Sequence, residues 1–186
     1  MIRIIGGNFR GRKIKVPGGT QVRPTSDRVR EAIFSMIEKR VPGARVLDLF
    51  AGTGSLGIEA VSRGAAHCVF VEKSRRIASV LHDNLSVLGV ESAFFEVVIS
   101  DAFHYLNRAS KMGIEFDIIF IDPPYKSGIG AKLLDTFALF PIVADHGLIL
   151  YEFKRGEDVR VPRGFHRERQ KNYGDTSIMT CIRKEG

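Results

Sequence analysis

The chain has 186 residues, of which 44% are hydrophobic and 26% charged, as in a globular protein with one full core. It contains no apolar run of about 18 residues, which excludes a membrane-spanning helix, and its basic first residues do not resemble a secretion signal. The formal net charge is +7, and residues 1–30 alone contain eight basic residues and one acid. This segment indicates either a polyanionic partner, most often nucleic acid, or a solubilising tail.

Cysteine and histidine usage bears on redox state and on metals. Cys68 and Cys181 lie in apolar runs, so we expect them to be small core residues in a reducing cytoplasm rather than a disulfide. The five histidines show no ligand spacing with each other or with cysteine, and we therefore expect no metal site. Nothing suggests an obligate dimer, and we expect a monomer.

The first elements of the chain are a predicted hairpin and a predicted helix. Residues 1–19 alternate apolar and basic residues on either side of a turn rich in Gly and Asn, which predicts a β-hairpin. Thr25, Ser26 or Asp27 can then cap a helix whose apolar residues follow helical spacing. We divide the chain into a hairpin arm, 1–22, and one domain, 23–186.

From residue 45 onward, apolar strands alternate with helices. The expected strands lie at 45–50, 68–72, 94–100, 116–122, 147–153 and 175–184. The expected helices lie at 55–64, 74–89, 102–110 and 131–140. The stretch 155–170 is unremarkable as a structural pattern. If the hairpin arm is only a solubilising tail, we expect the basic segment from Arg160 to Lys171 to recognise the substrate instead. Continuous apolar strands that alternate with helices predict an α/β fold, with a mostly parallel sheet covered on both faces.

A glycine-rich loop, "DLFAGTGSLG", joins the first of these strands to a helix. Gly52, Gly54 and Gly57 form a G-x-G-x-x-G pattern, which alone would indicate NAD or FAD. Asp48 precedes this pattern, however, and a carboxylate there would repel a pyrophosphate at the helix N-terminus. S-adenosylmethionine (AdoMet) has no phosphate and carries a sulfonium and an ammonium group. The loop, in which we include Phe50, is therefore predicted to bind AdoMet.

Acids follow three more strands. Glu72 could accept hydrogen bonds from both ribose hydroxyls, and Asp101 could accept one from the adenine amino group. Either acid taken singly is explained as well by helix capping. Four successive strands that end in an acid (Asp48, Glu72, Asp101 and Asp122) instead predict one binding edge, because parallel strands open onto one crevice.

The fourth acid begins the segment "DPPY", which has the features of a catalytic loop for an exocyclic amine. The Asp122 carboxylate and the Pro123 carbonyl could accept from the two N–H groups of such an amine and direct its lone pair toward the sulfonium. The two prolines fix the direction of that carbonyl. Tyr125 offers a flat face on which a base can stack.

The motifs together resemble a known family. "DLFAGTGSLG" with "DPPY" is similar to AdoMet-dependent amino-methyltransferases. "RIIGGNFRGRKIKVP", "RPTSDRVREAIF" and "NYGDTSI" resemble the RsmD-like bacterial 16S rRNA (guanine-N2)-methyltransferase family over nearly the whole chain. This resemblance implies a Rossmann-like seven-stranded methyltransferase fold with its last strand antiparallel and an N-terminal hairpin.

The resemblance also implies an activity and its residues. The expected reaction is methyl transfer to N2 of a guanine in 16S rRNA, within the assembled or assembling small subunit. The residues that match cofactor positions of the family are Thr25, Asp48, Gly52, Gly54, Glu72 and Asp101. Those that match its catalytic loop are Asp122, Pro123 and Tyr125. For the arm, we expect RNA contacts from Arg10, Arg12 and Lys13.

Two alternatives to this function stay open. The same loop chemistry would serve an amino-methyltransferase acting on DNA adenine or on a protein glutamine. A non-enzymatic RNA-binding protein on a former methyltransferase fold is the other alternative, against which the complete set of acids argues. No residue distinguishes guanine from adenine on physical grounds.

Overall fold

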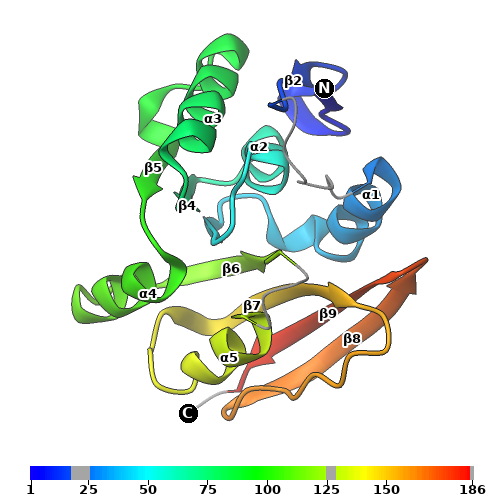
Figure 1. Cartoon of the computed structure of the whole chain (residues 1–186), viewed down its shortest axis with the longest axis vertical. Helices are drawn as coiled ribbons and strands as arrows, with labels where there is room; N and C mark the ends of the chain where they lie inside the picture. Colours follow the sequence, from blue (N-terminus) through cyan, green and yellow to red (C-terminus); the bar gives the residue numbers. More distant parts are fainter. Residues whose placement is uncertain (18–25, 125–128, 185–186) are drawn as a thin grey trace.

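A seven-stranded sheet forms the centre of the computed structural model, which describes residues 1–17, 26–124 and 129–184. Within this part of the chain the strands lie in the order β5-β4-β3-β6-β7-β9-β8 (Figure 1). Strands β3 to β7 are parallel to one another, and β9 is antiparallel to both β7 and β8. The predicted α/β fold, with a mostly parallel sheet of seven strands and an antiparallel last strand, is confirmed. The strands are β3 (Arg45–Asp48), β4 (His67–Glu72), β5 (Phe95–Ile99), β6 (Phe116–Ile121), β7 (Val143–Lys154), β8 (Phe165–Tyr173) and β9 (Thr176–Arg183).

Helices cover both faces of this sheet, as Figure 1 shows. One face packs against α1 (Asp27–Met36), α2 (Ser55–Ser62) and α3 (Arg75–Leu88), and the other against α4 (Ala102–Lys111) and α5 (Ile129–Thr136). Neighbouring strand residues therefore enter different cores: Val46 belongs to the core under α1, α2 and α3, and Leu47 to the core under α4 and α5. Burial on both faces explains why the central strands β3, β4 and β6 are continuous apolar runs.

The N-terminal hairpin is also present, as β1 (Ile2–Arg3) and β2 (Lys13–Ile14) joined through a 3-10 turn, η1 (Gly7–Phe9). It packs on the face that carries α1 and α2, where Ile4 and Ile14 are buried in the same core as Phe34. The hairpin is therefore an integral part of the packed molecule. The predicted boundary between residues 22 and 23 lies outside the described residues.

Two segments differ from the sequence-based expectation. The stretch 155–170 contains the start of β8, a strand that the sequence pattern did not predict. Residues 166–172 of β8 are all exposed, because this strand forms the edge of the sheet; it therefore lacks the apolar run or alternation by which strands are recognised. Helix α5 begins earlier than expected and ends at Thr136, so the predicted helix 131–140 is too long at its C-terminal end.

None of the helices in the described ranges is long and apolar enough to cross a membrane. In the same ranges no three side chains of His, Cys, Asp or Glu are grouped so as to hold a metal ion. Cys68 and Cys181 are both buried, and both are free thiols.

Candidate active site

Four acids lie at the carboxyl edge of the sheet. Asp48 and Glu72 are the last residues of β3 and β4, Asp101 follows β5 by two residues, and Asp122 directly follows β6. Since these strands are adjacent in the order β5-β4-β3-β6, the acids form a row: Asp101, Glu72, Asp48, Asp122. The structure thus brings together the four acids that the sequence singled out, at the edge where ligands of open α/β sheets bind.

Asp48 is the most buried acid of this row, with 2% of its surface exposed. Its Oδ2 accepts a hydrogen bond of 2.9 Å from the backbone N–H of Gly57, in the first turn of α2. The N-cap residue of α2 is Gly54, which has no side chain to do this, so Asp48 serves as the cap. Burial raises the pKa of Asp48 to about 7; the Gly57 hydrogen bond opposes this shift and the charge of Glu72 adds to it.

Glycine occupies the three positions of the loop for different structural reasons. A Cβ on Gly54 would lie 2.4 Å from Cδ1 of Leu81, and one on Gly57 would lie 2.2 Å from the ring of Phe70. Both positions therefore require glycine so that α2 can pack closely on α3 and β4. A Cβ on Gly52, at φ 53°, would make only an ordinary contact of 3.9 Å with the Phe50 carbonyl oxygen, so a side chain there would be strained only through its backbone conformation.

Glu72 ties the glycine loop to the end of β4. Its Oε2 accepts from the backbone N–H of Gly52 at 3.0 Å, and its Oε1 accepts from that of Ser74 at 2.7 Å. Ser74 in turn caps α3. Glu72 therefore already holds the backbone of the loop in place while its carboxylate lies at the binding edge.

Asp101 caps α4, because its Oδ1 accepts from the backbone N–H of Phe103 at 3.0 Å. Its other oxygen, Oδ2, lies 3.6 Å from the ammonium group of Lys73. The helix-capping interpretation of Asp101 thus holds in this structure. Only Oδ1 takes part in the capping hydrogen bond, and Oδ2 does not.

Asp122 and Pro123 form the start of the predicted catalytic loop. Asp122 is half-buried and Pro123 is buried, directly after the core strand β6. Phe50 is half-buried too and packs against the core under α4 and α5. Thr25 and Tyr125, which the sequence also singled out, lie outside the described residues.

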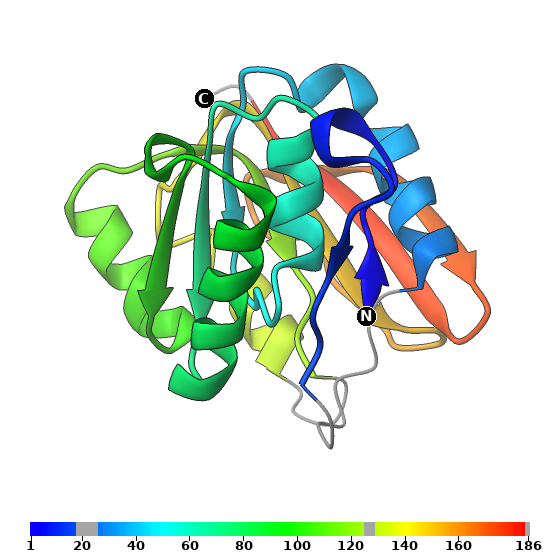
Figure 2. The same cartoon turned by 90° about the horizontal axis from the view of Figure 1, so that it is seen from above.

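The basic residues predicted for RNA lie at the opposite edge of the sheet. The hairpin turn contacts the end of α2, where Ser62 accepts from Phe9 N–H at 2.9 Å, and Arg12 Nη2 donates to the Val87 carbonyl at the end of α3 at 2.8 Å. These helix ends lie away from the carboxyl edge, because each helix runs back along the sheet. Figure 2 shows the dark blue turn at the top, whereas the arrowheads of the green strands point down. The structure therefore places the hairpin turn, with Arg10 and Arg12, away from the row of acids. The chain after Lys13 returns toward the glycine loop, because Lys15 hydrogen-bonds to Asn84 and Asn84 to Thr53.

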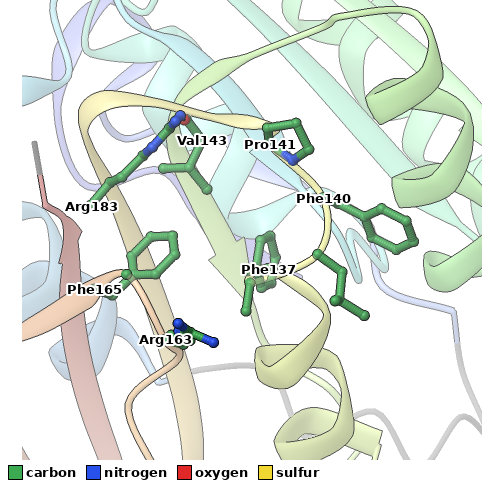
Figure 3. A pocket seen from close by; sticks show the side chains of 10 residues that line it. Phe137, Phe140, Pro141, Val143, Arg163, Phe165 and Arg183 are labelled. Carbon is green, nitrogen blue, oxygen red and sulfur yellow. The ribbon is translucent and has the colours of Figure 1, made fainter. Parts of the chain in front are cut away.

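A cavity of about 380 Å³ also opens at the opposite edge, beside the starts of β7 and β8. Figure 3 shows the rings of Phe137 and Phe165 facing it, with Arg163 and Arg183 nearby. It contains none of the residues predicted for cofactor binding or catalysis.

The chain is similar to known proteins over nearly its whole length. A family model described as "Conserved hypothetical protein 95" matches residues 2–182. The chain belongs to this family. Ribosomal RNA small subunit methyltransferase D of Escherichia coli K12 is 37% identical over 184 residues, which cover 98% of this chain and 90% of that protein. The predicted resemblance to the RsmD-like family is thereby confirmed.

Solved structures of similar chains agree with the fold. The Escherichia coli protein yhhF matches with a TM-score of 0.87 and 36% identity over 98% of both chains. A hypothetical protein of Thermus thermophilus matches with a TM-score of 0.84 and 30% identity, over 97% of this chain and 98% of that one. The methyltransferase fold also extends to SMU.776, crystallised with SAH: its TM-score is 0.63 at 19% identity, over 83% of this chain and 48% of that one.

Asn84 lies beside the glycine loop, and the sequence pattern did not identify it as a site residue. It is buried in α3, and its Nδ2 donates to the carbonyl of Thr53, in the glycine loop, and to that of Lys15, both at 3.1 Å. Its Oδ1 accepts from the backbone N–H of Lys15 at 2.8 Å. Asn84 thus connects the end of the hairpin to the cofactor loop. A polar residue on the buried face of an amphipathic helix is the signal that could have identified it.

Proposed function

We propose that this protein transfers the methyl group of AdoMet to the exocyclic N2 amine of a guanine in 16S rRNA. AdoMet is the cofactor, and ribosomal RNA methylation is the activity in the name of the relative that matches nearly the whole chain. The row of acids at the carboxyl edge is the observation that carries the proposal. The choice of guanine N2 rests on the family resemblance of the motifs.

The residues at this edge suit the charges of AdoMet. Asp48 and Glu72 accept only backbone N–H groups, and neither has an ion-pair partner in the described part of the chain. Two adjacent carboxylates without a cation favour a positively charged ligand and oppose a pyrophosphate. In the proposed site, Asp48 attracts the cationic methionine portion, Glu72 binds the ribose hydroxyls, and Asp101 Oδ2 accepts from the adenine amino group.

Bound AdoMet supplies an electrophilic methyl group on a sulfonium. Asp122 and the Pro123 carbonyl accept the two N–H groups of the guanine amine, which directs the nitrogen lone pair toward that methyl group. Transfer would break the S–CH3 bond as the N–CH3 bond forms, with S-adenosylhomocysteine as the leaving group. The nitrogen would then be positively charged, so the Asp122 carboxylate or a water molecule could remove its proton. Tyr125 is proposed to stack against the base.

A labelling experiment tests this function directly. The protein is incubated with isotopically labelled AdoMet and with small ribosomal subunits assembled from unmodified 16S rRNA, and the digested nucleosides are analysed by mass spectrometry. We expect the label in N2-methylguanosine. Label in a methylated adenine or in a protein glutamine would instead support the alternative acceptors, and DNA and ribosomal protein fractions are analysed in parallel for this reason.

A further inference from the structure

Strand β8 is a long edge strand with an exposed surface of mostly basic side chains. In the described part of the chain it pairs with β9 alone, and all residues from 166 to 172 are exposed. Four of these seven are basic types, one is acidic and two are amides: His166, Arg167, Arg169, Lys171, Glu168, Gln170 and Asn172. The strand is also the outermost one of the sheet (Figure 1, orange).

The register of β8 places three of the basic side chains on one face. His166, Arg169 and Lys171 lie opposite Ile182, Thr180 and Ile178 of β9, and directly opposed residues of an antiparallel pair point to the same face. That face is the one on which α1 packs, since Ile178 and Ile182 belong to its core. The irregularity between Arg167 and Arg169 causes this grouping: Arg167 lies opposite Cys181, on the other face. We call His166, Arg169 and Lys171 the basic strip.

The one acid within β8 does not cancel the charge of the basic strip. Glu168 Oε1 lies 3.6 Å from the guanidinium of Arg40, and its Oε2 accepts from the Thr180 hydroxyl at 3.3 Å. Arg40 therefore offsets the charge of Glu168, and the charge of the basic strip is left uncancelled by this acid. Among the described residues, Arg169 and Lys171 have no acidic partner, so the basic strip presents two exposed cations beside the imidazole of His166. Exposed cations that follow one another along a strand have the charge pattern of a polyanion-binding site.

The direction of β8 relates the basic strip to the active site. Because β9 is antiparallel to both β7 and β8, β8 runs in the same direction as β7 and ends at the carboxyl edge, where Asp122 lies. At about 3.3 Å per residue, the distance from His166 to Lys171 is roughly 17 Å. The basic strip therefore extends along β8 toward the carboxyl edge of the sheet, where the target base must enter the proposed active site.

We propose that the basic strip binds backbone phosphates of the ribosomal RNA substrate and thereby orients the RNA at the active-site edge. This proposal rests on the proposed function. A protein strand added to β8 is disfavoured, because the exposed residues 166–172 include no apolar side chain to pack against a partner strand, and charged edges oppose such pairing. The hairpin turn is a weaker candidate, because it lies at the opposite edge and Arg12 is occupied by the Val87 carbonyl.

The test compares three double variants that each remove two positive charges: R169Q/K171Q in the basic strip, R10Q/K13Q in the hairpin, and R108Q/K111Q at the end of α4. All six side chains are exposed. Binding to small subunits assembled from unmodified 16S rRNA, and to the free transcript, is measured as a function of salt. Each phosphate contact contributes about 0.7–0.9 to the slope of log K against log salt. We expect R169Q/K171Q to lower that slope by roughly 1.5 units with both substrates, while the α4 variant keeps the wild-type slope.

AdoMet affinity and thermal melting of each variant show whether the fold and the cofactor site are intact. A wild-type slope for R169Q/K171Q would overturn the proposal, and a loss confined to R10Q/K13Q would assign the RNA contact to the hairpin instead. Weaker binding to subunits with unchanged binding to free 16S rRNA would indicate a ribosomal protein contact and also overturn it. Methylation of the same subunits by the wild-type protein is measured in parallel. Failure of that reaction would contradict the proposed function, whereas an intact reaction with unchanged slopes would contradict only the basic strip.

Discussion

Asp122 lies where a buried strand ends and two prolines begin, and the proposed mechanism assigns it the alignment of the target amine. Asp122→Ala is expected to lower the rate of methyl transfer by about 10²-fold or more, because an acceptor aligned for the transition state is lost. AdoMet affinity should stay within a few-fold. Single-turnover transfer and calorimetry measure the two quantities, with the exposed Asp135→Ala as the control. Near-normal turnover of Asp122→Ala would rule out the assigned role.

Glu72 combines a structural and a binding role. Glu72→Ala is expected to weaken AdoMet binding by about 1.5–3 kcal/mol, since charged hydrogen bonds to the ribose are lost. Glu72→Gln keeps an oxygen that can accept from the N–H of Gly52 or of Ser74, which separates loss of the ligand contact from disorder of the loop. Calorimetry that shows unchanged affinity for both variants would exclude Glu72 from the ribose site.

The raised pKa of Asp48 predicts that AdoMet binding depends on pH. Burial raises its pKa to about 7, so the free protein holds a proton there below that pH. A cationic ligand favours the ionised carboxylate, so binding below pH 7 must release the proton from Asp48. The affinity for AdoMet should therefore fall as the pH is lowered below 7, by up to about tenfold per pH unit. Titrations between pH 5.5 and 7.5 measure this fall, which Asp48→Asn should remove. Equal pH profiles for the two proteins would contradict the argument.

At the scale of elements, the hairpin is held on α2 by a buried carboxylate. Glu59, with 0% of its surface exposed, accepts from the backbone N–H groups of Ile5 and Gly6, both at 2.8 Å, and from Arg63 Nε at 2.7 Å. Asn84 continues this connection to the glycine loop. The hairpin and the cofactor loop are therefore linked through the helices between them, although Lys15 and Thr53 are 38 positions apart in sequence.

Glu59→Ala tests this linkage. It leaves two backbone N–H groups and a guanidinium without their acceptor, and we expect a loss of about 2–4 kcal/mol in the free energy of unfolding. Denaturant titration measures the loss, with the exposed Glu38→Ala as the control. A difference below about 1 kcal/mol between the two variants would mean that the apolar contacts of Ile4 and Ile14 alone hold the hairpin.

At the scale of the whole molecule, a ligand that binds only the folded protein raises its stability. AdoMet at about 100 times its dissociation constant should add about 2.7 kcal/mol, which raises the melting temperature of a protein of this size by roughly 5–10 °C. NAD at the same concentration should produce no shift, because the acids at the carboxyl edge oppose its pyrophosphate. Thermal melts with each of the two ligands measure both expectations. A comparable shift with NAD, or displacement of AdoMet by it, would overturn the choice of cofactor.

The sequence by itself determined the fold class and the row of acids. Strands buried on both faces are continuous apolar runs, so their ends, and the acids Asp48, Glu72, Asp101 and Asp122 at those ends, can be read locally. It did not determine β8, whose exposed position at the sheet edge removes the apolar signal, or the length of α5. Only the tertiary structure decided that Asp48 caps α2, that Glu72 holds Gly52, and that the basic hairpin turn lies away from the active-site edge. These facts depend on which distant segments pack together, which no local pattern of residues specifies.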